Sequence, residues 1–237
     1  MSQDRLDPVA AFAELGRISL AENDLHGVLD RVADLARRTV PGTEEASVTL
    51  VRMGTAKTAA YTGPLALALD EWQYRRGTGP CLAAAAEQTT VSAPDLAGDR
   101  RWPGWAERAV AAGVRSSLSV GLIIGEQVHG ALNLYGVRDA AFDHDAVVLA
   151  ETFAGFAAVA LSNANLYGTT ARLARQLEAA MASRAVIEQA KGIIMGSRRC
   201  TADEAFAILT AISQDSNRKL RDVAAALVAE AGNGGDR

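Results

Sequence analysis

Between Glu151 and Gly192 the chain contains no proline and only two glycines, Gly155 and Gly168. Proline removes a helix hydrogen bond and glycine is a weak helix former, so their scarcity predicts one long helix in this part of the chain. Stepping alternately four and three residues gives Leu166, Thr170, Leu173, Leu177, Ala180, Arg184, Ile187, Lys191 and Ile194. This spacing, apolar at first and interrupted later, is typical of a coiled coil. We expect two copies of the chain to form a parallel homodimer through this helix. The alternative is an amphipathic helix that packs on its own chain.

The 237 residues are enough for two domains, and their chemistry changes near Leu166. Residues 1–166 hold 14 Lys/Arg and 20 Asp/Glu, whereas residues 167–237 hold 10 and 8, so the net charge of −4 divides into −6 and +2. The composition, 49% hydrophobic and 22% charged, argues against disorder, and 48 alanines against 12 aromatic residues favour close-packed helices. Charge alone neither establishes nor excludes a nucleic-acid partner.

Cysteines and histidines are few and scattered. Cys81 and Cys200 fall in different expected domains, and the histidines are His26, His129 and His144. No His/Cys group has the spacing of a structural zinc site. We recognise no signal peptide and no apolar span of about 20 residues. We therefore expect a cytoplasmic protein that has no metal or cofactor and does not bind a membrane.

The N-terminal part has the pattern of hairpins preceded and followed by helices. Apolar residues at helical spacing predict helices near 12–19 and over 25–36, and a last helix begins at Asp143. Alternating or β-prone runs predict strands over 46–52, 57–62, 117–124 and 128–135, the last two joined by Gly125-Glu126-Gln127. Hairpin links favour an antiparallel sheet with helices packed on one face.

Several short blocks follow one another in a set order in this part. They are Gly77-Thr-Gly-Pro-Cys81, Pro94-Asp95, Asp99-Arg-Arg-Trp-Pro103, Gly113-Val-Arg-Ser-Ser-Leu-Ser-Val120, Gly130-Ala-Leu-Asn-Leu-Tyr135 and Phe142-Asp143. Their order resembles a GAF domain of the actinobacterial type over roughly the first 165 residues. The resemblance implies an α+β fold, with a central antiparallel sheet flanked by helices, and a regulatory role in sensing a small molecule or a protein.

The sequence of this domain departs from the motif of GAF domains that bind cyclic nucleotides. Cyclic-nucleotide-binding GAF domains carry Asn-Lys, a later Phe and Asp-Glu, whereas here Leu134 follows Asn133, and Asp143-His-Asp-Ala146 follows Phe142. This argues against a cyclic nucleotide. We expect Cys81 to be a small buried side chain at the start of an alanine-rich helix. A thiol redox enzyme that uses Cys81 is the alternative.

Two other features have a structural and a functional interpretation. His129 and His144 are expected to be ordinary histidines, with haem ligation as the alternative. Trp102 and Trp105, in a Pro/Gly loop, are expected to fill the edge of a core, with an aromatic ligand cage as the alternative.

The C-terminal part predicts three short helices that must pack together, because each is too short to be stable alone. The first ends near Gly196, the second opens with the capping box Thr201-Ala-Asp-Glu204, and the third follows Asp215-Ser-Asn217. Cations line the polar sides of the first and third helices. They are Arg184, Lys191, Arg198, Arg199, Arg218, Lys219 and Arg221. Cations at a helix N-terminus oppose the helix dipole, which favours a phosphate site there; the alternative is a solvated face paired with Glu188, Asp215 and Asp222.

A second resemblance covers nearly all of this part. It rests on Ser183-Arg184, Ile187, Gln189-Ala-Lys-Gly192, Ile194-Met195, Asp203-Glu-Ala-Phe206, Leu209, Ser213-Gln214, Asn217-Arg-Lys-Leu220 and Asp222-Val-Ala224. These residues resemble an ANTAR domain, which implies an RNA-binding three-helix antiterminator that holds a nascent leader as paired stem-loops. The resemblance implies RNA contacts at Arg184, Lys191, Asn217, Arg218 and Lys219. Arg198, Arg199 and Arg221 are added on charge and position alone.

The sequence thus predicts an α+β protein in five parts. They are a flexible start (1–7), a GAF-like sensor (8–165), a coiled-coil connector (166–182), an ANTAR-like RNA-binding bundle (183–231) and a disordered tail (232–237). The expected function is signal-controlled transcription antitermination through leader RNA, without catalysis. A DNA-binding transcriptional regulator is the first alternative, and the thiol enzyme is the second.

Overall fold

The structure is a computed structural model that describes residues 5–19, 25–125 and 128–233. It divides into two compact units, Met1–Gly168 and Thr169–Arg237. The expected turn residues Glu126 and Gln127 lie outside the described residues, as do parts of the expected flexible start and tail.

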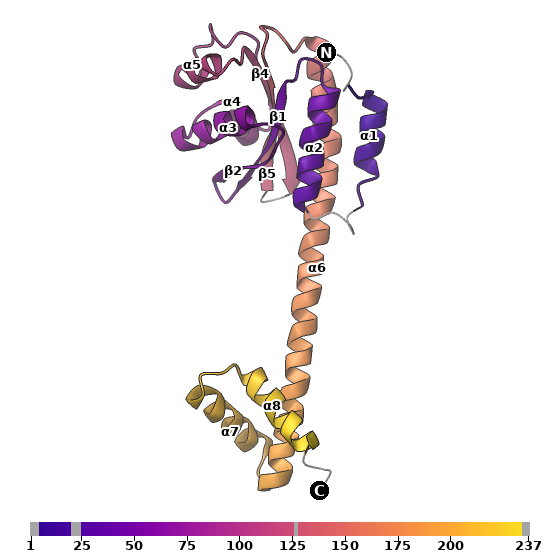
Figure 1. The fold of residues 1–237 in the computed structure, drawn as a ribbon, viewed down its shortest axis with the longest axis vertical. Helices are drawn as coiled ribbons and strands as arrows, with labels where there is room; N and C mark the ends of the chain where they lie inside the picture. The colour runs from indigo at the N-terminus through magenta and orange to yellow at the C-terminus, as the bar shows by residue number, and fades with distance from the viewer. Residues whose placement is uncertain (1–4, 20–24, 126–127, 234–237) are drawn as a thin grey trace. The chain divides into compact units, whose positions relative to one another are not determined.

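The first unit is built on a five-stranded antiparallel sheet (Figure 1). Its strands are β1 (Glu45–Arg52), β2 (Thr55–Tyr61), β3 (Thr90–Ala93), β4 (Ser116–Gly125) and β5 (Val128–Gly136). They lie in the order β2-β1-β5-β4-β3. The two predicted hairpins, β1–β2 and β4–β5, are confirmed, and β1 joins them by pairing with β5.

Helices cover both faces of this sheet, so the expectation of helices on one face is wrong (Figure 1). The helices of the unit are α1 (Pro8–Gly16), α2 (Leu25–Thr39), α3 (Pro64–Arg76), α4 (Pro80–Glu87), α5 (Pro103–Ala111) and the start of α6 (His144–Arg198). One core joins α2 and α6 to the face that carries Val48, Leu118 and Leu132. The opposite face, through Ala131, packs against Cys81 and Ala84 of α4.

The second face needs its own helices because side chains alternate along each strand. Val48 and Leu50 enter the first core, so Ser47, Thr49 and Val51 face α3 and α4. Each of the unexpected helices α3 and α5 has a proline in its first turn, where the lost N–H has no helical partner. Gly77 ends α3 in the left-handed conformation (φ 69°) that favours glycine.

The long helix predicted from the proline-free run is present as α6. It also contains an 18-residue stretch with mean hydropathy 1.5, long and apolar enough to cross a membrane by length and composition alone. This finding differs from the expectation of no apolar span. Part of the apolar content has a structural explanation, because Ala150, Phe153 and Leu161 pack into the core against the sheet.

The second unit is a three-helix bundle made by the end of α6, α7 (Ala202–Asp215) and α8 (Leu220–Asn233). Its core contains Ala190, Ile194, Ala205, Leu209 and Ala224. The predicted capping box is confirmed: Thr201 Oγ1 accepts from the Glu204 N–H, and the Glu204 carboxylate accepts from the Thr201 N–H. The small alanines in this core let the helices approach closely.

Candidate functional site

A cavity of about 610 Å³ lies in the first unit, between one sheet face and the α3–α4 segment. Its lining includes Val51 of β1, Ala56 of β2, His129 of β5, Tyr74 of α3, and Thr78 and Leu82 around α4. The remaining lining on the helix side is mostly glycine and alanine, whose small side chains leave room. The space is within the range that holds a small molecule.

A hydrogen-bonded network lies on the same sheet face and meets the cavity at Tyr74. The Tyr74 hydroxyl is 2.9 Å from Thr49 Oγ1 and 2.9 Å from Thr58 Oγ1. Thr58 donates to Asp70 Oδ2 at 2.9 Å, and the Tyr135 hydroxyl donates to Asp70 Oδ1 at 2.5 Å. A single hydroxyl, that of Thr58, therefore separates Tyr74 from the Asp70 carboxylate.

Asn133 belongs to this network but is incompletely satisfied. Its Nδ2 donates to Ser47 Oγ at 3.1 Å and to Thr49 Oγ1 at 2.9 Å. Its Oδ1 is buried and accepts no hydrogen bond from any described residue, and the buried Nε2 of Gln73 likewise has no described partner. Buried polar atoms are nearly always paired, so these two atoms mark an unusual region of the interior.

Asp70 is fully buried and has no ion pair among the described residues. Loss of hydration on burial raises its pKa from 3.8 to about 6, against the opposing effect of hydrogen bonds from Ser47, Tyr135 and Thr58. A buried carboxylate is normally paired with a cation or neutralised. Here the groups that donate hydrogen bonds to it are all neutral, and the neighbouring charge of Glu71 raises its pKa further.

The Cys81 thiol is confirmed as buried, near the start of α4. Burial raises the pKa of the thiol well above its ordinary value, and the charge of Asp70 acts in the same direction. The thiolate is the nucleophile in cysteine chemistry, so this environment suppresses reactivity. The thiol-enzyme alternative loses its physical basis at this residue.

Trp105 is 1% exposed, and its indole Nε1 donates to the Leu69 carbonyl at 3.3 Å, which confirms it as a core residue. Trp102 is half-buried and lines the cavity, so the two tryptophans do not form a cage around one ligand. His129 lines the cavity from the start of β5, whereas His144 is exposed at the start of α6.

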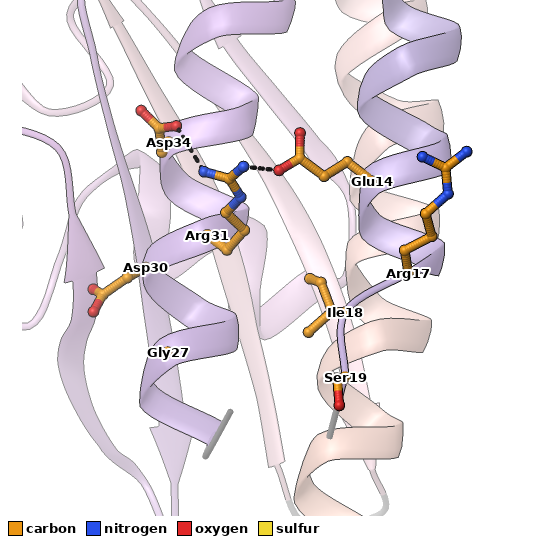
Figure 2. Close-up of a pocket in the computed structure, with 8 residues that line it drawn as sticks. All are labelled: Glu14, Arg17, Ile18, Ser19, Gly27, Asp30, Arg31 and Asp34. Atoms are coloured by element: carbon orange, nitrogen blue, oxygen red, sulfur yellow. Dashed lines mark ion pairs between the residues drawn. The ribbon is translucent and has the colours of Figure 1, made fainter. Parts of the chain in front are cut away.

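Figure 2 shows a second cavity, of about 520 Å³, between α1 and α2. Arg31 of α2 forms an ion pair with Glu14 of α1, and its Nη1 lies 3.7 Å from Asp34 Oδ2. These contacts tie α1 to α2 across the cavity. Since the charges are already paired and partly exposed, we assign them a structural role.

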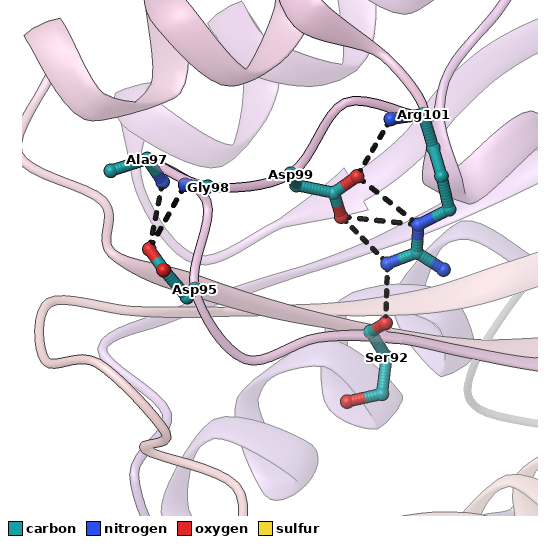
Figure 3. Close-up of polar contacts among 6 residues, drawn as sticks. All are labelled: Ser92, Asp95, Ala97, Gly98, Asp99 and Arg101. Atoms are coloured by element: carbon teal, nitrogen blue, oxygen red, sulfur yellow. Dashed lines mark hydrogen bonds and ion pairs between the residues drawn. The ribbon is translucent and has the colours of Figure 1, made fainter.

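The loop Asp95–Arg101 is held by its own side chains (Figure 3). Asp95 accepts from the N–H groups of Ala97 and Gly98, and Asp99 forms a salt bridge of 2.6 Å with Arg101. Arg101 also donates to the Ser92 carbonyl of β3 at 2.7 Å. These blocks of the N-terminal resemblance therefore shape a loop, and their polar groups are engaged within it.

In the second unit, the structure places the eight predicted RNA-contact residues in three groups. Arg184 and Lys191 lie on α6, where Lys191 Nζ is 3.0 Å from Glu188 Oε2. Arg198 ends α6 and Arg199 follows it. The rest lie at the α7–α8 turn and in the first turn of α8: Asn217, Arg218, Lys219 and Arg221.

The α6–α7 and α7–α8 turns lie at opposite ends of α7, which has 14 residues and is therefore about 21 Å long (Figure 1). Arg198 and Arg199 are consequently separated from the α7–α8 turn. At that turn Asn217 has a φ of 49°, and Ser213 Oγ donates to the Arg218 carbonyl at 2.6 Å. Arg218 and Lys219 precede α8, so they stand at its N-terminal end.

Several large apolar side chains of α6 are exposed. In the first unit Phe156 is 51%, Val159 60% and Leu166 67% exposed; in the second unit Leu173 and Leu177 are similarly exposed. Phe156 and Val159 continue the 4-3 spacing backwards from Leu166, which the sequence analysis did not include. Phe206 of α7 is also exposed, at 44%.

Sequence reasoning missed the Asp70 network because it did not predict α3. The available signal was Gly63-Pro64, followed by five residues rich in leucine and alanine, a single aspartate and, seven residues after it, Gly77. That pattern is typical of a helix with proline in its first turn and glycine after its last residue, and such a helix contains Asp70.

Comparison with known proteins identifies both parts. A family model of the GAF domain matches residues 22–162, and a family model of the ANTAR domain matches residues 175–228. No curated protein sequence matches the chain significantly.

Solved structures share the fold of the first unit. The free methionine-R-sulfoxide reductase of Neisseria meningitidis, in complex with its substrate, is 19% identical, with 69% of this chain and 91% of that chain covered and a TM-score of 0.52. The phycocyanobilin-bound GAF domain of a cyanobacterial phytochrome is 15% identical, with 68% and 97% covered and a TM-score of 0.51. The GAF domain of a Coxiella burnetii phosphoenolpyruvate-protein phosphotransferase is 15% identical, with 68% of this chain and 96% of that chain covered and a TM-score of 0.51. At these identities the likeness shows the fold alone.

Proposed function

Because this chain belongs to the GAF domain family and carries an ANTAR domain behind its GAF domain, we propose that it is a signal-controlled, RNA-binding regulator of transcription antitermination. Its ANTAR bundle binds paired stem-loops in nascent leader RNA, and the GAF domain controls that binding. The observation that carries the proposal is the ANTAR match on a basic three-helix bundle. A protein that acts on nascent bacterial-type transcripts works in the cytoplasm.

The α7–α8 turn has the chemistry to hold an RNA backbone. The N-terminus of α8 presents backbone N–H groups and the positive end of the helix dipole, and Arg218, Lys219 and Arg221 add cations there. Phosphate contacts fix the position of a bound nucleic acid, while exposed polar groups such as Asn217 can reach unpaired loop bases. Exposed Phe206, in the first half of α7 and away from this turn, offers a separate surface for base stacking.

We also propose that α6 pairs with α6 of a second copy. Exposed Leu173 and Leu177 lie on the 4-3 spacing that two helices use to interlock, and Phe156 and Val159 extend it. A dimer places two ANTAR bundles on one RNA, and two linked sites bind a paired target more tightly than one.

The test is charge reversal at two positions, Lys191→Glu with Arg218→Glu. The matched control is Arg100→Glu with Arg138→Glu, which makes the same charge change at exposed positions of the GAF domain. We expect the first variant to lose binding to a double-hairpin RNA in a gel-shift titration and the control to bind as wild type does. If RNA binds the first variant at wild-type strength, the contact surface is wrong.

The DNA-binding alternative is tested in the same titration with a DNA duplex of equal charge. Asp222 lies in the first turn of α8 and is half exposed, so a groove-reading α8 would bring a carboxylate to DNA phosphates. We expect the double-hairpin RNA to compete better than the duplex at physiological salt. A duplex that binds more tightly would overturn the antiterminator proposal.

A further inference from the structure

Asp70 is a buried carboxylate with no positively charged partner among the described residues. The side chain is 0% exposed, and its hydrogen-bond donors, Ser47, Thr58, Tyr135 and Asn133, are all neutral. Neutral hydrogen bonds reduce the cost of burying a carboxylate but do not cancel its charge. An ionised Asp70 is therefore a buried anion that still favours a cation.

The cavity gives a path from outside to this anion. Tyr74 lines the 610 Å³ cavity, and its hydroxyl is in hydrogen-bond distance of Thr58, which donates to Asp70. Thr49, on the other side of the Tyr74 hydroxyl, accepts from Asn133. The Tyr74 side chain and the Thr58 hydroxyl therefore separate the cavity from the carboxylate, and a ligand that enters from the cavity reaches Asp70 by displacing Tyr74.

The buried groups around this path favour a ligand that donates hydrogen bonds. Asn133 Oδ1 is buried and accepts from no described residue, and the hydroxyl oxygens of Thr49 and Thr58 can also accept. The outer cavity, by contrast, has apolar walls at Val51, Ala56 and Leu82. The matching molecule has a cationic head with several N–H groups and a short apolar tail.

We propose that the GAF cavity binds a small organic cation, an alkylammonium or alkylguanidinium, whose head group supplies the counter-charge to Asp70 and whose tail fills the outer cavity. The inference rests on the proposed sensing role of the GAF domain and names the chemical class of its ligand. Binding moves Tyr74, which belongs to α3, and so links occupancy of the cavity to the helices on this face of the sheet.

The experiment titrates the full-length protein with n-butylammonium chloride by calorimetry, at constant ionic strength and about pH 7.5. The neutral molecule of the same shape, 1-butanol, is the comparison probe. Wild type should bind butylammonium at least about tenfold more tightly than 1-butanol, as expected for a desolvated charge pair. Asp70→Asn should abolish this preference. The matched control Asp139→Asn, an exposed aspartate outside the cavity, should keep it.

A second measurement on wild type does not depend on the folding of the variant. Because the pKa of Asp70 is about 6, its carboxylate is mostly protonated near pH 5, and affinity for butylammonium should fall about tenfold from its value near pH 7.5. No preference for the cation in wild type, the same preference in Asp70→Asn, or affinity independent of pH would each overturn the proposal. Binding of double-hairpin RNA to the same samples tests the antiterminator function separately, since either result can fail alone.

Discussion

Asp70 makes the stability of the GAF domain depend on pH in a direction opposite to that of most carboxylates. Its pKa is raised by burial from 3.8 to about 6, so between these values the folded protein holds a proton that the unfolded chain has released. The contribution of Asp70 to the free energy of unfolding is therefore largest below about pH 4 and falls by roughly 3 kcal/mol as the pH rises to about 6. Above that range the contribution is constant.

Urea unfolding of wild type and Asp70→Asn between about pH 4.5 and pH 7.5 checks this prediction. Other carboxylates titrate in both proteins, so the difference between the two unfolding free energies isolates Asp70. We expect wild type to lose stability relative to the variant as the pH rises. A difference that stays constant across the range would show that Asp70 is not a buried titrating group.

Two glycines should respond in opposite ways to the same substitution. A Cβ on Gly130 of β5 would overlap the Thr49 carbonyl oxygen of the neighbouring strand, so Gly130→Ala should destabilise the GAF domain by about 1–3 kcal/mol. Gly155, inside α6, has nothing within 4 Å of its Cβ position. Gly155→Ala should therefore stabilise by about 0.5–1 kcal/mol. Thermal unfolding of both variants measures these changes in stability. Equal shifts in Tm for the two variants would contradict the close packing around Gly130.

The burial of Cys81 could be predicted from its local sequence, whereas the burial of Asp70 could not, because it depends on the tertiary structure. Cys81 follows a turn and precedes an alanine run, so its local sequence already predicts a small buried side chain. Asp70 is buried because α3 lies over the polar side of β1, β2 and β5. That position depends on pairings between distant strands, which a single sequence does not reveal.

At the scale of elements, the two ends of α7 should contribute unequally to RNA binding. Arg198 is the last residue of α6 and Arg199 follows it, so both lie at the end where the helix dipole is negative and itself stabilises cations. Arg218 and Lys219 precede α8, where the dipole is positive and disfavours them unless an anion is bound. Because Arg218 and Lys219 are unfavourable at the N-terminus of α8 without a bound anion, their position there indicates a phosphate site.

Arg218→Ala with Lys219→Ala should thus weaken RNA binding more than Arg198→Ala with Arg199→Ala, although both remove two charges. Each lost phosphate contact lowers the slope of log K against log salt by about 0.7–1, so the first variant should lose up to about two units of slope. Gel-shift titrations over a salt series measure both quantities. Equal losses in the two variants would mean that RNA contacts both ends of α7.

The elements that sequence reasoning found are those with local signals. The hairpins β1–β2 and β4–β5, the capping box of α7 and the long α6 all have periodicity or turn residues of their own. The helix α3 was missed because its apolar residues show weak helical periodicity, and α5 and the four-residue β3 were missed because they are short. Without α3, the second covered face of the sheet could not be predicted.

For the whole molecule, the division of charge has a physical consequence. The first 166 residues carry a net −6 and the remainder +2, so the GAF part repels an RNA that the ANTAR part attracts. Under the proposed function, this asymmetry should direct RNA toward the ANTAR bundle. A net charge of −4 averaged over the chain conceals it.

Dimerisation through α6 should decide whether the protein distinguishes a double from a single hairpin. Leu173→Glu with Leu177→Glu places carboxylates on the 4-3 spacing, where two copies would bring like charges together. We expect this variant to be monomeric in analytical ultracentrifugation. It should also lose most of the preference for double-hairpin RNA, while its affinity for a single hairpin changes little, because avidity requires two linked sites.

The control for this prediction is Ala179→Glu with Ala182→Glu, which adds the same two charges to exposed positions of α6 off the 4-3 spacing. It should remain dimeric and keep the preference for the double hairpin. Since both variants add the same negative charge near the ANTAR bundle, a general electrostatic effect on RNA would weaken both equally. A monomeric variant that still prefers the double hairpin would show that one ANTAR bundle reads both stem-loops, and the role proposed for α6 would then be wrong.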